Sequence, residues 1–199
     1  TIRDFAQEIT EEPEMDSGFA ARSPFSPFPP VKQSMPSARI LLLMGVAGSG
    51  KSTIGRQLAA ELGWPYHEAD DYHSAANQEK MGRGIPLDDY DRAPWLAALR
   101  TAMDARLAAG HSAVFTCSGL KDKYRRVLMD GAPGVSLVYL ACDLKTSLAR
   151  VGRRHGHYLK ADMVKSQFAA LEPPTDALTI DARQSPEKII AEIRQAQAL

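Results

Sequence analysis

The chain has few cysteines, no net charge and no long apolar run. Only two of its 199 residues are cysteine, Cys117 and Cys142, and each stands at the end of an apolar run. This placement favours buried, reduced thiols over a disulfide or a metal site. No apolar stretch approaches the roughly 18 residues that a membrane-spanning helix needs. Because 24 basic residues balance 24 acidic ones, we expect a cytoplasmic protein with neither a membrane nor a nucleic acid as partner.

The first 36 residues have neither a helical nor a strand period. They contain six of the 13 prolines and carry three basic residues against six acidic ones. They lack the apolar core of a signal peptide and are too acidic for a mitochondrial presequence. We therefore predict an extended or disordered extension over residues 1–36, a passive tail in preference to a Pro-rich interaction arm. Residues 37–199 are predicted to form one folded domain.

A glycine-rich stretch follows the first apolar run of this domain. After residues 40–44 the chain matches the pattern Gly-x-x-x-x-Gly-Lys-Ser/Thr, which is typical of loops that bind nucleoside triphosphates. Glycines let the backbone curl round an anion at the positive end of the following helix. The alternative is a glycine-rich turn without a ligand. The predicted nucleotide-binding residues are Gly45, Val46, Ala47, Gly48, Ser49, Gly50, Lys51, Ser52 and Thr53.

Two side chains of this loop have predicted roles in chemistry. Lys51 is placed to reach the β and γ phosphates, and the Ser52 hydroxyl is placed to hold Mg²⁺. We therefore predict ATP and Mg²⁺ as cofactors, with Lys51 as a catalytic residue and Ser52 as a metal ligand.

Beyond the loop, short apolar runs alternate with segments of helical period. Strands separated by helices pair in parallel through right-handed crossovers, with helices on both faces of the sheet. We predict a three-layer α/β fold around the P-loop, with a five-stranded parallel sheet. A polar stretch from residue 69 to Asp89 has no assigned structure. The predicted strands cover residues 40–44, 64–68, 113–117, 135–141 and 177–181.

Polar residues just after the second strand are candidates for binding and activating the hydroxyl group that accepts a phosphoryl group. Ligands of open α/β sheets lie beyond the carboxyl ends of the strands. Asp70 is there predicted to orient or deprotonate a hydroxyl, and His73 to bind substrate. The alternative is a solvated acidic turn.

A basic cluster between two predicted helices, residues 150–160, is a candidate lid. Its arginines, Arg150 and Arg154, are predicted to close over the transferring phosphate. A solvated basic face is the alternative. The histidines of the cluster lack the partners of a zinc site.

Longer motifs give a more specific resemblance. The stretch Asp70-x-x-His73, the run from Gly84 to Leu96, and the segment Cys117-Ser118-Gly-Leu120-Lys121-x-x-Tyr124-Arg125 resemble gluconate kinases related to shikimate kinases. The basic loop with Arg154-x-Gly-His157-Tyr158 resembles the same family. The likeness runs from residue 40 to the end of the chain. The sequence departs from the family where Glu68-Ala69-Asp70 stands in place of Asp-Gly-Asp, and where Ser74 replaces a Pro.

The resemblance implies a P-loop kinase fold with a mobile lid, and a homodimer. It also implies phosphorylation of D-gluconate by ATP at its terminal hydroxyl. A gluconate-like acceptor needs a carboxylate clamp and hydroxyl partners. Another small-molecule kinase, such as a shikimate kinase, and a nucleotide-binding regulatory module without catalysis are the alternatives. Arg92 has a competing role in capping and ion pairing at a helix start. The predicted substrate-binding residues are Asp70, His73, Arg92, Lys121 and Arg125.

Overall fold

The computed structural model describes residues 38–153 and 161–199. Five strands form a single parallel sheet in the order β2-β3-β1-β4-β5, which confirms the predicted fold class. The strands are β1 (Ile40–Met44), β2 (Tyr66–Glu68), β3 (Ala113–Cys117), β4 (Val135–Ala141) and β5 (Leu178–Asp181). The helices are α1 (Lys51–Leu62), the 3₁₀ helix η1 (Ala69–Tyr72), α2 (Ala75–Gly82), α3 (Asp89–Ala108), α4 (Asp122–Met129), α5 (Leu144–Gly152), α6 (Ala161–Ala170) and α7 (Pro186–Gln197).

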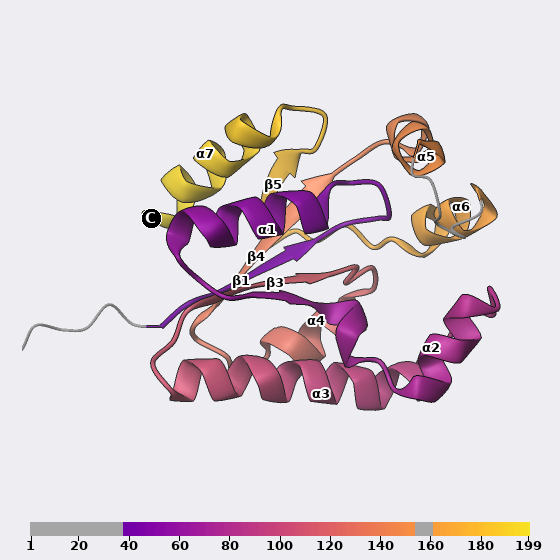
Figure 1. The fold of residues 1–199 in the computed structure, drawn as a ribbon, viewed down its shortest axis with the longest axis horizontal. Coiled ribbons are helices and arrows are strands. Elements are labelled where there is room, and N and C mark those ends of the chain that lie inside the picture. Colours follow the sequence, from indigo (N-terminus) through magenta and orange to yellow (C-terminus); the bar gives the residue numbers. More distant parts are fainter. Residues whose placement is uncertain (1–37, 154–160) are drawn as a thin grey trace, which may run out of the picture. The chain divides into compact units, whose positions relative to one another are not determined.

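Alternation along the central strand builds two apolar cores. Leu41 and Leu43 of β1 pack with α1 and α7, whereas Ile40, Leu42 and Met44 pack with α3 and α4 on the other face. Figure 1 shows these helix pairs on opposite sides of the sheet. A strand covered on both faces is apolar throughout, as the unbroken run of β1 predicts.

The strand register brings the carboxyl ends of the central strands to one edge. Met44 at the end of β1 is aligned with Cys117 of β3 and with Tyr139 of β4. Glu68 at the end of β2 is aligned with Thr116. Helices α2, α5 and α6 gather at the end of the sheet where the loop between β1 and α1 emerges (Figure 1). The phosphate loop after β1 and the η1 turn after β2 therefore emerge at a common edge.

The polar stretch before Asp89 contains two helices, η1 and α2, that the sequence analysis did not assign. Helix α2 buries only Asn77, so it has no apolar period to reveal it. Its start is capped by Ser74, whose side chain accepts a hydrogen bond from the Asn77 N–H, a common role of serine at this position. Helix α3 begins at Asp89 behind a capping box formed by Asp88 and Asp91.

Some predictions fall outside the described residues. These are the N-terminal extension, residues 1–36, and most of the predicted lid, including Arg154. Within the described ranges, no helix has both the length and the apolar character needed to cross a membrane.

Candidate active site

The loop between β1 and α1 is a close-fitting ring of backbone. Gly45, Gly48 and Gly50 have positive φ angles of 148°, 81° and 99°, which favour glycine. A Cβ at Gly48 would lie 2.7 Å from the Ser147 carbonyl oxygen of α5. Lys51 Nζ donates to the Val46 carbonyl oxygen at 3.0 Å, so its side chain folds back over the loop.

A buried hydroxyl in this loop fits the binding of an anion. Ser49 is 1% exposed, and its Oγ has no hydrogen-bond partner in the described part of the chain. Burying a hydroxyl without a partner costs free energy, which a ligand oxygen would recover. The glycine conformations and this hydroxyl together fit a phosphate group.

One peptide unit of the loop is held by two distant helices. The Ala47 N–H donates to Gln167 Oε1 of α6 at 2.7 Å. The Ala47 carbonyl oxygen accepts a hydrogen bond from the Ser147 hydroxyl of α5. Neither Ser147 nor Gln167 was predicted as a site residue. No local pattern could have revealed them, because they lie 100 and 120 positions from Ala47.

Glu68 is the centre of a hydrogen-bond network behind the loop. Its Oε2 accepts from Ser52 Oγ at 2.6 Å and also from the Tyr66 hydroxyl, while its Oε1 accepts from Thr116 Oγ1 at 2.7 Å. Burial and the Glu68 carboxylate raise the pKa of Tyr66 to about 12, so its phenol stays a donor at neutral pH. Because Ser52 donates a hydrogen bond to Glu68, the lone pairs of Ser52 Oγ stay available to a cation.

Asp70 lies in η1 directly after this network. Desolvation raises the pKa of its carboxyl group, as does the neighbouring Glu68 carboxylate, while Lys51 opposes the rise. The residue is nevertheless exposed to solvent, so a proton can reach it. A carboxylate with a raised pKa beside a lysine is suited to accept a proton from a hydroxyl.

His73 is a buried, neutral group next to the same turn. Its ring stacks on Trp95 with centroids 4.4 Å apart, and its Nδ1 lies 3.4 Å from Asn77 Nδ2. Burial lowers the pKa of His73, and the charge of Arg92 adds to this effect. Trp95 in turn donates from Nε1 to the Ala69 carbonyl oxygen at 2.7 Å. These contacts fix the turn that carries Asp70 against α3.

The other predicted acceptor residues fall into two groups. Arg92 and Lys121 lie near the ring of Tyr124. Arg125 is 5% exposed, and its guanidinium donates to the Gly119 carbonyl oxygen at 2.9 Å. These contacts stabilise the loop after β3, and a substrate contact of Arg125 stays a prediction.

Arg150 lies on the outer side of the phosphate loop. Its Nη2 donates to the Ala182 carbonyl oxygen at 2.8 Å, and its Nη1 makes long contacts of 3.4 and 3.5 Å to the carbonyl oxygens of Gly48 and Ser49. It borders a hollow of about 550 Å³ that Arg153 and Arg183 also line. Arg150 thus joins the loop after β5 to the phosphate loop, and its catalytic role stays a prediction.

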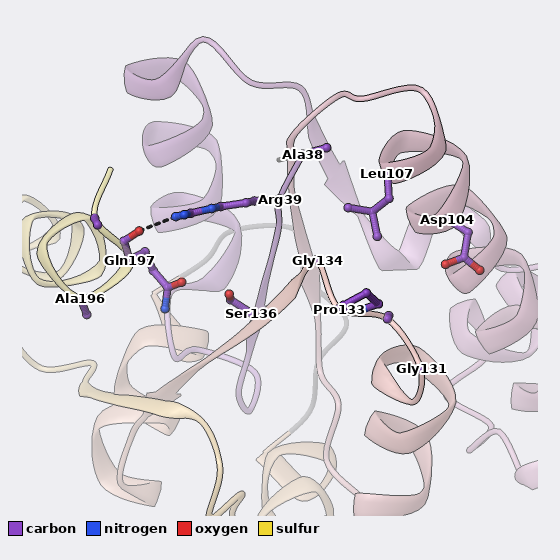
Figure 2. A pocket seen from close by; sticks show the side chains of 12 residues that line it. Ala38, Arg39, Asp104, Leu107, Gly131, Pro133, Gly134, Ser136, Ala196 and Gln197 are labelled. Carbon is purple, nitrogen blue, oxygen red and sulfur yellow. Dashed lines mark hydrogen bonds between the residues drawn. The ribbon is translucent and has the colours of Figure 1, made fainter. Parts of the chain in front are cut away.

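A larger hollow lies at the opposite end of the sheet. Its volume is about 880 Å³, and its lining includes Ala38 and Arg39, which immediately precede β1. Figure 2 shows Arg39 reaching the Gln197 backbone near the end of α7. The phosphate loop does not contribute to this hollow, so cavity size alone does not locate the candidate site.

Comparisons with known proteins agree with this geometry. A family model described as an AAA domain matches residues 40–174. The chain is 42% identical to the thermosensitive gluconokinase of Escherichia coli K12, over 78% of this chain and 85% of that protein. It is 40% identical to the gluconokinase of Gluconobacter oxydans 621H, over 80% and 92% of the two chains. The crystal structure of a gluconokinase from Sinorhizobium meliloti 1021 superposes with a TM-score of 0.71 at 36% identity, covering 81% of this chain and 92% of that one.

Proposed function

The chain belongs to the gluconokinase family of P-loop kinases, and from this premise we propose that it transfers the γ-phosphoryl group of ATP to the terminal hydroxyl of D-gluconate. The products are 6-phosphogluconate and ADP. The proposal rests above all on one observation. The phosphate loop after β1 and the turn after β2 that carries Asp70 emerge at one edge of the sheet, in a chain that is 42% identical to a gluconokinase.

Lys51 and Asp70 divide the work of the transfer. Lys51 supplies positive charge that strengthens its interaction with the phosphoryl oxygens as negative charge develops on them. Asp70 orients the acceptor hydroxyl and takes its proton. The backbone of the loop from Gly45 to Thr53 holds the phosphates of ATP. Arg150 and Arg154 are proposed to stabilise the transferred group from the side of α5.

The arrangement behind the loop fits Mg²⁺. Ser52 would hold the cation, and Glu68 would orient the Ser52 hydroxyl by accepting its hydrogen bond. When bound, Mg²⁺ neutralises charge on the β and γ phosphate oxygens. The longer side chain of Glu68, where the family has Asp, contacts Ser52 and Thr116 together.

The acceptor is proposed to bind between η1 and the start of α4. His73 and Asp70 lie on the side of η1, and Arg92 and Lys121 supply positive charge for the carboxylate of gluconate. Arg125 supports the loop that precedes Lys121. The homodimer implied by the family resemblance and the cytoplasmic location stay predictions.

A coupled assay of ADP formation tests this function. Gluconate, shikimate and glucose are offered separately with ATP and Mg²⁺, and Lys51→Ala protein purified in parallel controls for contaminating kinases. We expect gluconate-dependent ADP formation that greatly exceeds the rate with shikimate or glucose. ADP formation with shikimate but not with gluconate would contradict the proposal. ATP binding without turnover on any acceptor would favour a regulatory module.

A further inference from the structure

Tyr124 lies at the centre of a cluster of charges that joins α3 to α4. Its side chain is 8% exposed. Three cationic groups lie near its ring centroid, with Arg92 Cζ and Lys123 Nζ each at 5.6 Å and Lys121 Nζ at 5.8 Å. The face of an aromatic ring attracts cations at such distances. One phenol ring therefore gathers positive charge from two helices that are about 30 residues apart in sequence.

The hydroxyl of Tyr124 fixes the ring to the first turn of α3. It donates to Asp89 Oδ1 at 2.7 Å and accepts from Arg92 Nη1 at 3.3 Å. These two bonds use the hydroxyl both as donor and as acceptor. Replacing tyrosine with phenylalanine would remove both bonds and keep the ring.

The charges of the cluster do not balance. Asp89 is the carboxylate that bonds to the Tyr124 hydroxyl, and Asp89 Oδ2 lies 2.5 Å from Lys123 Nζ. Among the described residues, no carboxylate oxygen forms an ion pair with Arg92 or Lys121. Two cations beside one buried ring thus remain available to an anionic ligand, while Lys123 is neutralised.

The location of the two cations points to the acceptor. Lys121 caps the start of α4, just after the carboxyl end of β3. Arg92 is close enough to His73 to influence its pKa. Both cations therefore belong to the sheet edge that carries Asp70.

We propose that Tyr124 is a positioning residue of the acceptor site, which holds Arg92 and Lys121 as a pair of cations for the carboxylate of a sugar acid. This inference rests on the proposed function and names how its acceptor is selected. The pair favours an aldonate over the corresponding neutral sugar because a neutral sugar offers no charge to it. Asp89 holds Tyr124 in place, and Lys123 cancels the repulsion that Asp89 would exert on the acceptor.

Steady-state kinetics of matched variants test the inference. For Tyr124→Phe we expect the KM for gluconate to rise about tenfold, with kcat and the KM for ATP changed less than about threefold, because the lost hydrogen bonds orient a binding group. Tyr90→Phe is the matched control, since Tyr90 lies in α3 next to Asp89 and is 91% exposed. It should leave every constant unchanged.

Lys121→Met and Asp89→Asn supply tests of opposite sign. Lys121→Met should raise the KM for gluconate and weaken its increase with salt, because one screened charge is lost. Asp89→Asn keeps an acceptor oxygen for Tyr124 and removes negative charge, so the KM for gluconate should fall or stay constant.

Distinct outcomes separate this inference from the proposed function. If wild-type protein forms no ADP with gluconate, both are wrong. If wild-type protein is active and Tyr124→Phe leaves the KM for gluconate within about twofold, the inference alone is wrong. A parallel rise in the KM for ATP, accompanied by a lower melting temperature, would show that Tyr124 has only a structural role and would also overturn it.

Discussion

The phosphate loop is built mainly from backbone, whereas the acceptor side is built mainly from side chains. The loop occupies eight consecutive residues from Gly45 to Ser52, and its shape depends on glycine φ angles. The acceptor side instead joins Asp70, Arg92 and Tyr124, which come from three separate helices. A short backbone motif can be recognised in a sequence because the spacing of its glycines determines the shape of its backbone. A side-chain cluster depends on packing between distant segments.

The largest effect is expected where the loop contributes a charged side chain. Lys51→Ala should lower kcat by about two to four orders of magnitude, because charge stabilisation in the transition state is lost. The gluconate-dependent ADP assay measures this, with Lys188→Ala, an exposed lysine of α7, as control. Turnover close to that of the wild type would show that the loop works through its backbone alone.

On the acceptor side the corresponding charge is Asp70. Asp70→Asn should lower kcat by about two orders of magnitude and leave ATP affinity nearly unchanged, because the amide keeps the shape but cannot take a proton. Calorimetric titration with a non-hydrolysable ATP analogue measures the affinity, and Asp71→Asn is the neighbouring control. A large loss of nucleotide affinity would place Asp70 on the nucleotide side of the comparison.

A glycine substitution tests whether backbone geometry defines the nucleotide side. Gly48→Ala should weaken ATP binding by about 10- to 100-fold, since φ strain is combined with a steric clash. Gly110→Ala is the matched control, because Gly110 also has a positive φ of 73° but no atom lies within 4 Å of an added Cβ. Equal ATP affinity in the two variants would contradict a close-fitting loop.

The network behind the loop is expected to contribute to stability. Thr116→Val should lower the free energy of unfolding by about 1–2 kcal/mol, because Glu68 Oε1 loses the hydroxyl that donates to it. Urea unfolding measures this change. Thr101→Val removes a hydroxyl that bonds within an exposed helix turn and should have a smaller effect. If the two variants lose equal stability, the network adds nothing beyond an ordinary hydroxyl contact.

The smallest effect concerns the stability cost of Asp70. Its pKa is raised above the ordinary value of 3.8, so the native state binds a proton more tightly than the unfolded state. Stability is therefore lost as the pH rises through the interval between the unfolded and native pKa values. Asp70→Asn should raise the melting temperature by about 1–3 °C at pH 7, and the gain should disappear below the unfolded pKa. A lower melting temperature at pH 7 would show that the carboxylate stabilises the fold.

The sequence was sufficient for the sheet and the phosphate loop. Apolar runs of β1, β3 and β4 fixed the strands because parallel strands are buried on both faces. Helix α2 escaped prediction because a helix that buries one polar residue has no apolar stripe. Glycines at fixed spacing gave the loop because their φ angles are local properties.

The supporting residues of the site could not be read in the same way. Tyr66 and Thr116 have the ordinary composition of strands, and only the register between β2 and β3 brings them to Glu68. Arg125 and Arg150 contact backbone carbonyl groups, and those contacts carry no sequence signal. Residue type predicts which chemistry is possible, and packing decides which atoms meet.

The two hydrogen bonds on the Ala47 peptide limit how well the phosphate loop would keep its structure if it were moved into another protein. A designer who moved residues 45–53 into another strand–helix unit would transfer all the glycines and the lysine. The transplant would leave behind the Ser147 donor and the Gln167 acceptor. The N–H and carbonyl groups of Ala47 would then form hydrogen bonds with water instead. Modularity in this protein therefore extends to three non-contiguous pieces of chain, and a successful graft has to carry α5 and α6 with the loop.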